Sequence, residues 1–265
     1  YYFCVFAKSK GKLKKAIVFK FELRYLLYDF HIIAKKKGDM WSMKFRHEIK
    51  HKISLSDYFV LRQRLSAVAK CDIHGTNGKY QIRSLYFDDM HDTALMEKIS
   101  GVNKREKFRL RYYNGDISYI RLEKKCKENG LCSKEAAILT IQETRKILEG
   151  DIEWLIESDR PLLRELYLKM VTKGLRPKTI VDYQRDAFVF PAGNVRVTLD
   201  YDMKTGLGGI DFLNPDCVMV PVRENPMILE VKWDEFLPSV IRDIVQLEGR
   251  SDTAYSKYAA SRIYG

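Results

Sequence analysis

The sequence contains no long apolar run. Its most apolar-leaning stretch, residues 16–34, is interrupted by the ionisable side chains of Lys20, Glu22, Arg24, Asp29 and His31. A helix that crosses a bilayer needs about 20 consecutive, mostly apolar residues. These interruptions exclude a polytopic membrane protein.

Paired cysteines are lacking as well. The five cysteines, Cys4, Cys71, Cys126, Cys132 and Cys217, are an odd number and include no C-x-x-C pair. This pattern favours reduced thiols in a cytoplasmic protein over a disulfide framework or a zinc site.

Residues 43–265 contain no repeat, proline-rich linker or low-complexity tract that would divide them. Hydrophobic residues make up 46% of the 265 residues and aromatic residues 12%, which excludes intrinsic disorder because there is ample apolar surface to bury. We therefore predict one α+β domain over residues 43–265.

Acidic residues are too few to balance the basic ones. The chain has 47 Lys and Arg against 35 Asp and Glu, a formal net charge of +12. Such an excess predicts an anionic partner, such as nucleic acid, anionic lipid or a phosphate-rich molecule. Residues 1–42 supply +7 of this charge from ten basic and three acidic residues, so only +5 belongs to the predicted domain.

Residues 1–42 have neither an initial methionine nor a proline, and they follow no helix or strand period for long. One interpretation is a basic, aromatic anchor at a membrane surface. We favour another, in which they are non-native upstream translation of A/T-rich DNA, or a disordered basic segment, with Met43 as the true start.

From Met43 onward, hydrophobic periodicity predicts strands and helices. Ser54 or Ser56 is expected to cap the first helix, and Asn114-Gly115-Asp116 to turn a hairpin. The expected strands are 44–53, 80–88, 104–113, 118–127, 179–190, 195–202, 219–222 and 227–233. The expected helices are 55–69, 93–99, 135–148, 152–158, 161–171, 237–247 and 253–263.

One face of these strands carries charge at every second position. A solvated outer face is the ordinary explanation, but exposed strands seldom repeat an acid-x-Lys triplet, as 48–50, 123–125 and 230–232 do. If the sheet closes, these side chains line an interior that needs polyanion, metal and water to be stable. The inward set comprises the bases 46, 50, 52, 107, 109, 111, 121, 125, 185, 196 and 232 and the acids 48, 123, 200 and 230.

The order of motifs resembles the triphosphate tunnel metalloenzyme (CYTH-like) superfamily, and most closely the VTC-type polyphosphate polymerase domain in its bacterial form. The motifs span residues 43–265 in order and are RHEIK (46–50), SLYFD (84–88), KFRLRY (107–112), LEKK (122–125), YQRDA (183–187), RVTLD (196–200), LEVK (229–232) and SKY (256–258). The resemblance implies a closed antiparallel β-barrel with helices packed outside and a C-terminal helix at the tunnel mouth.

The resemblance also implies roles for individual residues. The catalytic set would be Lys50, Arg109, Arg111, Arg196 and Glu230. Phosphate would be bound by Arg46, Lys107, Lys125, Lys134, Tyr183, Arg185, Lys232, Ser256 and Lys257, with Lys134 on a loop. Mn²⁺ or Mg²⁺ would be bound by Glu230, with Glu48, Glu123 and Asp200 as further or water-mediated ligands.

The implied activity is metal-dependent phosphoryl transfer from ATP to polyphosphate, with pyrophosphate among the related ligands. Such chemistry depends on positioning and charge neutralisation, which arginine forks, lysines and a hard metal supply. A separate membrane partner protein would receive the product, and no nucleic acid would bind, because the strand bases pair with acids rather than interleave with exposed aromatics.

Arg46 departs from the pattern of hydrolytic relatives, which begin with E-x-E-x-K and so place a glutamate there. This favours polymerase activity or plain polyphosphate binding by an accessory domain, and it places hydrolysis of tripolyphosphate or nucleoside triphosphates third.

Two other motifs compete with this interpretation. His47-Glu48-Ile49-Lys50-His51 matches H-E-x-x-H, the zinc protease signature, but that site needs a helix and the surrounding alternation indicates a strand. The glycines of residues 205–209 lack the strand-to-helix spacing of a nucleotide-binding loop and predict a mobile loop.

Overall fold

The computed structural model describes residues 46–73, 75, 78–247 and 253–262. Residues 1–42, which were expected to be non-native or disordered, lie outside the described residues. Cys4 is one of them. The expected start of the domain at Met43 therefore stays a prediction.

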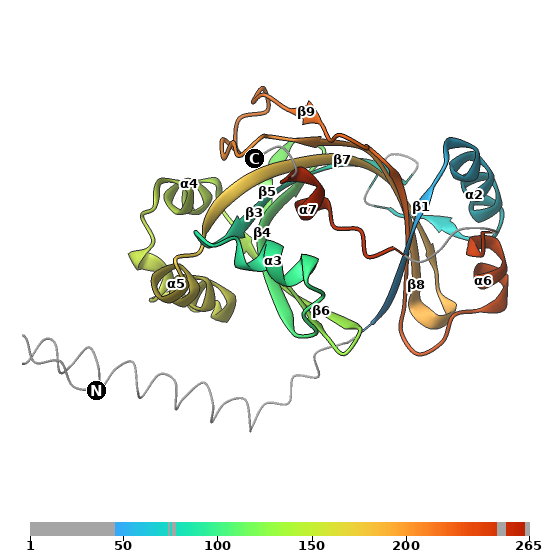
Figure 1. Cartoon of the computed structure of the whole chain (residues 1–265), viewed down its shortest axis with the longest axis horizontal. Coiled ribbons are helices and arrows are strands. Elements are labelled where there is room, and N and C mark those ends of the chain that lie inside the picture. Colours follow the sequence, from blue (N-terminus) through green and yellow to red (C-terminus); the bar gives the residue numbers. More distant parts are fainter. Residues whose placement is uncertain (1–45, 74, 76–77, 248–252, 263–265) are drawn as a thin grey trace, which may run out of the picture. The chain divides into compact units, whose positions relative to one another are not determined.

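A ten-stranded, antiparallel sheet forms the body of the described part (Figure 1). Eight strands follow the order β1-β10-β8-β7-β3-β4-β5-β6, while β2 pairs with β7 and β9 with β8. The strands are β1 (His47–Ile53), β2 (Lys70–Cys71), β3 (Lys79–Asp88), β4 (Arg105–Tyr113), β5 (Asp116–Glu128), β6 (Leu131–Leu139), β7 (Arg176–Phe190), β8 (Val195–Thr205), β9 (Val220–Pro221) and β10 (Met227–Trp233).

The sheet is curled into a half-barrel, as Figure 1 shows. Its edge strands β1 and β6 approach each other at one end, where the N–H of Arg46 donates to the carbonyl of Cys132 (3.1 Å) and the N–H of Cys132 donates back (3.2 Å). Among the described residues, this isolated bridge is the one backbone pairing that joins the β1 edge of the sheet to the β6 edge. This bridge alone does not show the fully closed barrel that the resemblance implied, so full closure stays a prediction.

Six α-helices accompany the sheet in the described ranges. In Figure 1, α4 and α5 lie beyond one half of the sheet, α2 and α6 beyond the other, and α3 and α7 within its curve. The helices are α2 (Leu55–Val68), α3 (Thr93–Ile99), α4 (Ile141–Glu149), α5 (Pro161–Lys173), α6 (Ser239–Val245) and α7 (Lys257–Ser261), with 3₁₀ turns η1 (Glu153–Leu155) and η2 (Ala192–Asn194).

Two apolar cores bind the outer helices to the convex face of the sheet. Leu110 and Leu122 pack with Leu163 and Leu166 of α5, and Val197 and Leu229 pack in the same way with α2 and α6. The apolar positions of the alternating strands thus face the helices, as the sequence predicted. The charged positions are left for the concave face.

Local sequence signals explain several boundaries. Ser54 caps α2 by accepting from the N–H of Asp57 (3.2 Å), and Asp57 accepts in return from the N–H of Ser54 (2.9 Å), a capping box. Asn114 (φ 52°) and Gly115 (φ 73°) turn the β4–β5 hairpin, because both central residues of such a tight turn need a positive φ. Both features were predicted.

The expected helix over residues 135–148 was wrong in its first part. Residues 131–139 form β6, paired along its length with β5, and the helix α4 begins only after Thr140, whose hydroxyl accepts from the N–H of Glu143 (3.1 Å). Glu135 to Leu139 are good helix formers, and pairing with β5 overrides that propensity.

Other boundaries differ less. The helix expected over 152–158 is the short 3₁₀ turn η1, and those expected over 237–247 and 253–263 are reduced to α6 and α7. The strand over 219–222 is the two-residue β9, while β7 and β8 extend beyond their expected bounds. Within the described residues, no helix combines the length and apolarity that crossing a membrane requires.

Candidate functional site

The concave face carries the charged residues that the alternation predicted. Strand register places their side chains opposite one another: Arg109 faces Glu123 across β4 and β5, Arg185 faces Asp200 across β7 and β8, and Lys50 faces Glu230 across β1 and β10. Three clusters result, each built on buried carboxylates.

Glu123 is the centre of the first cluster and is fully buried. Arg109 donates to it twice, through Nε (2.8 Å) and Nη2 (2.6 Å), and Lys134 donates at 3.1 Å. Arg111 Nη1 lies 3.7 Å away, while Arg111 Nε donates to the hydroxyl of Ser84 and Nη2 to that of Tyr183. We call these four charged residues the Glu123 cluster. Lys134 was expected on a loop, but it lies on β6.

Asp200 is the centre of the second cluster and is also fully buried. Arg185 binds it through two parallel hydrogen bonds (2.6 and 2.7 Å), and Lys257 of α7 donates at 2.5 Å. The Lys257 ammonium also lies 4.6 Å from the centroid of the Tyr183 ring. In this Asp200 cluster, helix α7 therefore contributes a cation to a site otherwise built by strands.

Glu48 and Glu230 share the third cluster with three lysines. Lys50 lies 3.0 Å from Glu48 and 3.6 Å from Glu230, so it bridges the two carboxylates. Lys125 reaches across from β5 to Glu48 (2.7 Å), and Lys232 binds Glu230 (2.6 Å). We call this group the Glu48–Glu230 cluster.

All four carboxylates are held ionised by their cations. Burial and the charge of Glu230 raise the pKa of Glu48, but the three lysines of the cluster outweigh both and lower it to about 2. Burial likewise opposes ionisation of Glu230, Asp200 and Glu123, yet attraction to neighbouring Lys and Arg side chains holds each pKa below its ordinary value. At neutral pH the concave face therefore presents alternating fixed charges.

Tyr86 and Ser84, which were not predicted as site residues, face the same interior. Arg109 Nη1 donates to the Tyr86 hydroxyl (3.3 Å), and the Tyr86 ring stacks on Tyr258 of α7 (5.2 Å between centroids). Burial raises the pKa of the Tyr86 phenol, but nearby Arg109 and other cations outweigh it and lower the pKa to about 8. The alternation within SLYFD (84–88) puts both residues on the inward face and could have identified them.

Lys107 and Ser256, two of the residues expected to bind phosphate, lie together in the structure. Lys107 donates to the Ser256 hydroxyl (3.1 Å), and its ammonium lies 5.7 Å from the Tyr258 ring centroid. Burial lowers the pKa of Lys107 to about 8, and the like charges of neighbouring lysines act in the same direction. No carboxylate of the described residues forms an ion pair with Lys107.

Arg46 and Arg196 form their ion pairs with carboxylates outside the three clusters, although Arg196 lies opposite Lys232 in the register of β8 with β10. Arg46 forms an ion pair with Asp234 (2.8 Å) and also donates to the carbonyl of Asn194. Arg196 forms an ion pair with Asp72 (2.6 Å) and donates to the Tyr80 hydroxyl. The predicted catalytic role of Arg196 and phosphate-binding role of Arg46 stay predictions.

The four predicted metal ligands do not form one group. Across the described ranges, no set of three or more His, Cys, Asp or Glu side chains is close enough to hold a metal ion. Glu48 and Glu230 share Lys50 and Lys232 as ion-pair partners, whereas Glu123 and Asp200 bind cations in separate clusters. Mg²⁺ is commonly held by one or two carboxylates with water and substrate phosphates, so the ionised Glu48 and Glu230 fit such an ion.

The H-E-x-x-H motif does not form a metal site. Residues 47–51 belong to β1, so His47 and His51 project from the face opposite to Glu48. His47 stacks on Trp233 (5.3 Å between ring centroids) on the neighbouring strand. The strand predicted for these residues is confirmed, and it argues against the zinc protease interpretation, which was kept as a remote alternative. The glycines near residue 206 form a turn after β8, where the N–H of Gly209 donates to the carbonyl of Gly206.

Comparison with protein families decides the relationship. The model of the VTC domain matches residues 45–263, which is most of the chain. The chain belongs to the VTC domain family.

Solved structures similar to this VTC domain share little sequence with it. They include the PH1819 protein of Pyrococcus horikoshii OT3 (11% identity, covering 81% of this chain and 96% of that one, TM-score 0.43) and the PH1012 protein of the same organism (12%, 80% and 96%, TM-score 0.43). A proposed adenylate cyclase of Bacillus halodurans is 13% identical, over 71% of this chain and 81% of that one, with a TM-score of 0.41.

At these identities the assignment rests on the family match alone. A search of the curated proteins finds no match to this VTC domain.

Proposed function

We propose that this VTC domain catalyses metal-dependent phosphoryl transfer from ATP to the end of a growing polyphosphate chain within the curled sheet. The observation that carries the proposal is the concave face itself, where Lys50, Arg109, Arg111, Lys125, Lys134, Arg185, Lys232 and Lys257 surround four carboxylates. Such a density of cations from many strands fits a substrate with several phosphates.

The arginines and lysines have complementary tasks in this proposal. Arg109, Arg111 and Arg185 offer planar forks that match phosphate oxygens, whereas the lysines act as point charges that follow a linear chain. A bound phosphate group takes the place of a carboxylate as the partner of these cations. The half-barrel in this way acts as a tunnel that holds donor and acceptor in line.

The metal would be held by Glu230 and Glu48, the two carboxylates that share lysine partners. A bound Mn²⁺ or Mg²⁺ supplies charge neutralisation on the transferring phosphate oxygens. Lys50 lies between the two carboxylates and would orient the transferring phosphoryl group beside them.

The phosphoryl transfer requires no nucleophile from the protein. A terminal oxygen of the polyphosphate chain attacks the γ-phosphorus of ATP, the bond between that phosphorus and the β–γ bridging oxygen breaks, and ADP leaves. The attacking oxygen is already anionic, so no general base is required. Arg46, which stands where hydrolytic relatives carry a glutamate and is bound to Asp234, supports transfer to a chain over hydrolysis.

An assay with ATP and Mn²⁺ tests this proposal. We expect the purified protein to form acid-labile polyphosphate, and we expect Lys50→Ala and Glu230→Ala to abolish its formation. Lys52→Ala is the matched control, because Lys52 lies two residues from Lys50 on β1 but binds the exposed Glu224 outside the clusters (2.8 Å).

The products formed in these assays distinguish a polymerase from a hydrolase and from an accessory binding domain. Release of orthophosphate from tripolyphosphate, without polymer, would identify a hydrolase. Tight binding of polyphosphate with no turnover would identify an accessory domain. Either result would contradict polymerase activity.

A further inference from the structure

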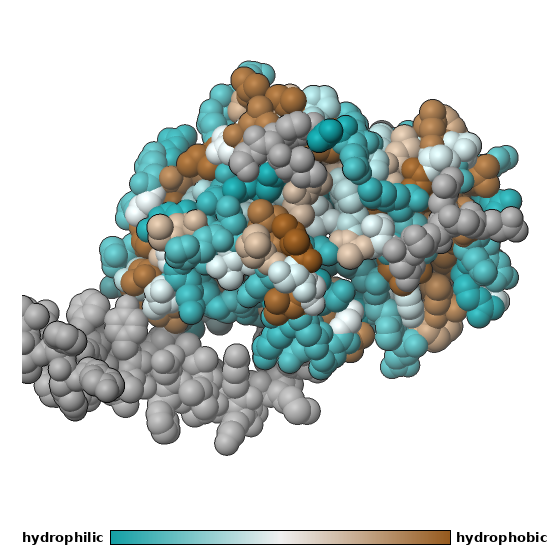
Figure 2. All heavy atoms as spheres, viewed as in Figure 1, coloured by the Kyte–Doolittle hydropathy of each residue, from teal (hydrophilic) through white to brown (hydrophobic). Residues whose placement is uncertain are grey.

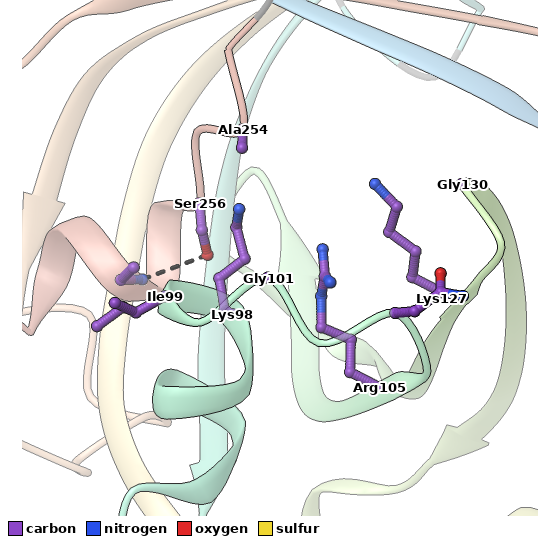
Figure 3. A pocket seen from close by; sticks show the side chains of 10 residues that line it. Lys98, Ile99, Gly101, Arg105, Lys127, Gly130, Ala254 and Ser256 are labelled. Carbon is purple, nitrogen blue, oxygen red and sulfur yellow. Dashed lines mark hydrogen bonds between the residues drawn. The ribbon is translucent and has the colours of Figure 1, made fainter.

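A pocket of about 560 Å³ opens beside the concave face, between α3, the β4–β5 pair and the segment leading into α7. Figure 3 shows the side chains of Lys98, Arg105 and Lys127 extending in the same direction from three different elements. Ser256 and Ala259 line the pocket from the α7 side. In Figure 2, hydrophilic residues gather at the lower edge of the molecule, below α3 and beside β6.

The three cations of this pocket differ from those of the clusters. Each is half-buried, and no carboxylate of the described residues lies within ion-pair distance of Lys98, Arg105 or Lys127. Within the part of the chain that the structure describes, Arg105 donates to the backbone carbonyl of Val102 alone. Burial lowers the pKa of Lys98, and the charges of Arg105 and Lys127 add to this effect. Half-buried like charges that form no ion pair with a carboxylate favour an anionic ligand.

A hydrogen bond links the lining of the pocket to the concave face. Ser256, which lines the pocket, accepts a hydrogen bond from Lys107, and Lys107 lies two residues before Arg109 of the Glu123 cluster. Lys50 and Lys125 of the Glu48–Glu230 cluster also act on the charge of Lys98. A linear anion that leaves the clusters past Ser256 therefore enters this pocket.

We propose that Lys98, Arg105 and Lys127 form a binding site for the part of a linear polyphosphate chain that extends beyond the three clusters, so that affinity depends on chain length. The proposal rests on the proposed function for the identity of the polyanion. A triphosphate is short enough to be held within the clusters, whereas a long chain reaches the pocket as well.

Binding measurements with tripolyphosphate and with long-chain polyphosphate test this site. We expect the triple variant Lys98→Ala/Arg105→Ala/Lys127→Ala to lose about tenfold or more in affinity for the long chain, which is about 1.4 kcal/mol. Its affinity for tripolyphosphate is expected to stay within about twofold of the wild type, a result that also demonstrates intact folding. The charge-preserving variant Lys98→Arg/Arg105→Lys/Lys127→Arg should retain long-chain affinity.

The control variant removes the same charge elsewhere. Lys104→Ala/Lys146→Ala/Lys173→Ala alters three exposed lysines outside the pocket, one of them next to Arg105, and should leave both affinities unchanged. Equal losses for the two ligands, or a loss in the control as large as in the test variant, would overturn the proposal. Equal competition by single-stranded DNA would do so too, since it would indicate a general polyanion surface.

Binding of polyphosphate in the pocket and polymerase activity can be tested separately. If the wild type binds polyphosphate with the expected dependence on the pocket but forms none from ATP, the pocket stands and polymerase activity does not. If the wild type binds neither polyphosphate nor tripolyphosphate, both proposals are wrong.

Discussion

At the scale of single residues, Glu123 has an unusual position, because it is fully buried beneath two arginines and a lysine. Replacing it with glutamine leaves Arg109 and Arg111 without their anion, and breaking a buried ion pair costs about 3 kcal/mol. We expect urea unfolding of Glu123→Gln to show a loss of that order.

Added tripolyphosphate should restore part of that stability, because an anion again occupies the partner position of the arginines. Glu157→Gln, at an exposed position, serves as the control. A Glu123→Gln protein that unfolds like the wild type would show that the arginines need no counterion.

Lys107 and Tyr86 predict how phosphate binding depends on pH. Both have a pKa lowered to about 8. As the pH rises through 8, Lys107 loses its positive charge and Tyr86 gains a negative one, so both changes weaken anion binding. Affinity for tripolyphosphate, measured by calorimetry on both sides of pH 8 at constant ionic strength, should therefore fall.

The double variant Lys107→Arg/Tyr86→Phe isolates this effect. It stays charged at position 107 and cannot ionise at 86, so only the titration of the ligand remains. An unchanged pH profile in the double variant would mean that neither residue contacts the anion.

At the scale of elements, the short helix α7 is held in place by its own tyrosine. The Tyr258 hydroxyl donates to Asp88 (2.7 Å), the same carboxylate that accepts from N–H groups at the start of α3. Tyr258→Phe removes one buried hydrogen bond, worth about 1 kcal/mol. Because α7 carries Ser256 and Lys257, we expect a loss of up to about fivefold in tripolyphosphate affinity.

Tyr255→Phe provides the comparison, since Tyr255 precedes α7 and its hydroxyl donates only weakly, to the sulfur of Met203 (3.5 Å). Circular dichroism should be unchanged in both variants. An undiminished affinity in Tyr258→Phe would show that the strands alone hold Lys257 in place.

Strands were easier to predict than the helix boundaries around them. Arg109 and Glu123 could be assigned to the inward face because alternation with period two fixes the side of each residue once a strand exists. The hairpin at Asn114-Gly115 was also recognisable, but the register that brings Arg109 opposite Glu123 depends in addition on an irregularity between Arg111 and Tyr113, which shifts the pairing of β4 with β5. The inward face was therefore within reach of the sequence, whereas the pairing of Arg109 with Glu123 was not.

Strand β6 and the pocket that contains Lys98, Arg105 and Lys127 could not be predicted from the sequence, for different reasons. Glu135 to Leu139 have helical propensity, and only pairing with β5 makes them a strand, although the Thr140–Glu143 capping box marks the true start of α4. Lys98, Arg105 and Lys127 come from separate elements. The register of β4 with β5 puts Arg105 opposite Lys127, and the packing of α3 against β4, which strand alternation does not encode, adds Lys98.

At the scale of the whole molecule, ligand binding should be visible as thermal stability. Tripolyphosphate at about 100 times its dissociation constant should add about 2.7 kcal/mol to the free energy of unfolding, by mass action on the folded state. Differential scanning calorimetry should show a higher melting temperature with tripolyphosphate, and a smaller increase as salt screens the charges. Sulfate at equal ionic strength is the control, and an equal increase with sulfate would argue against a site for several phosphates.

The clusters also make the concave face comparable to an ion-exchange resin that carries its own counterions. Each cation bound to Glu48, Glu123, Asp200 or Glu230 is already compensated, so an incoming anion must displace a carboxylate rather than fill a vacancy. Displacement favours ligands of high charge density on a short backbone. We therefore expect any selectivity for condensed phosphates over single phosphate ions or chloride to depend on the carboxylates as much as on the basic residues.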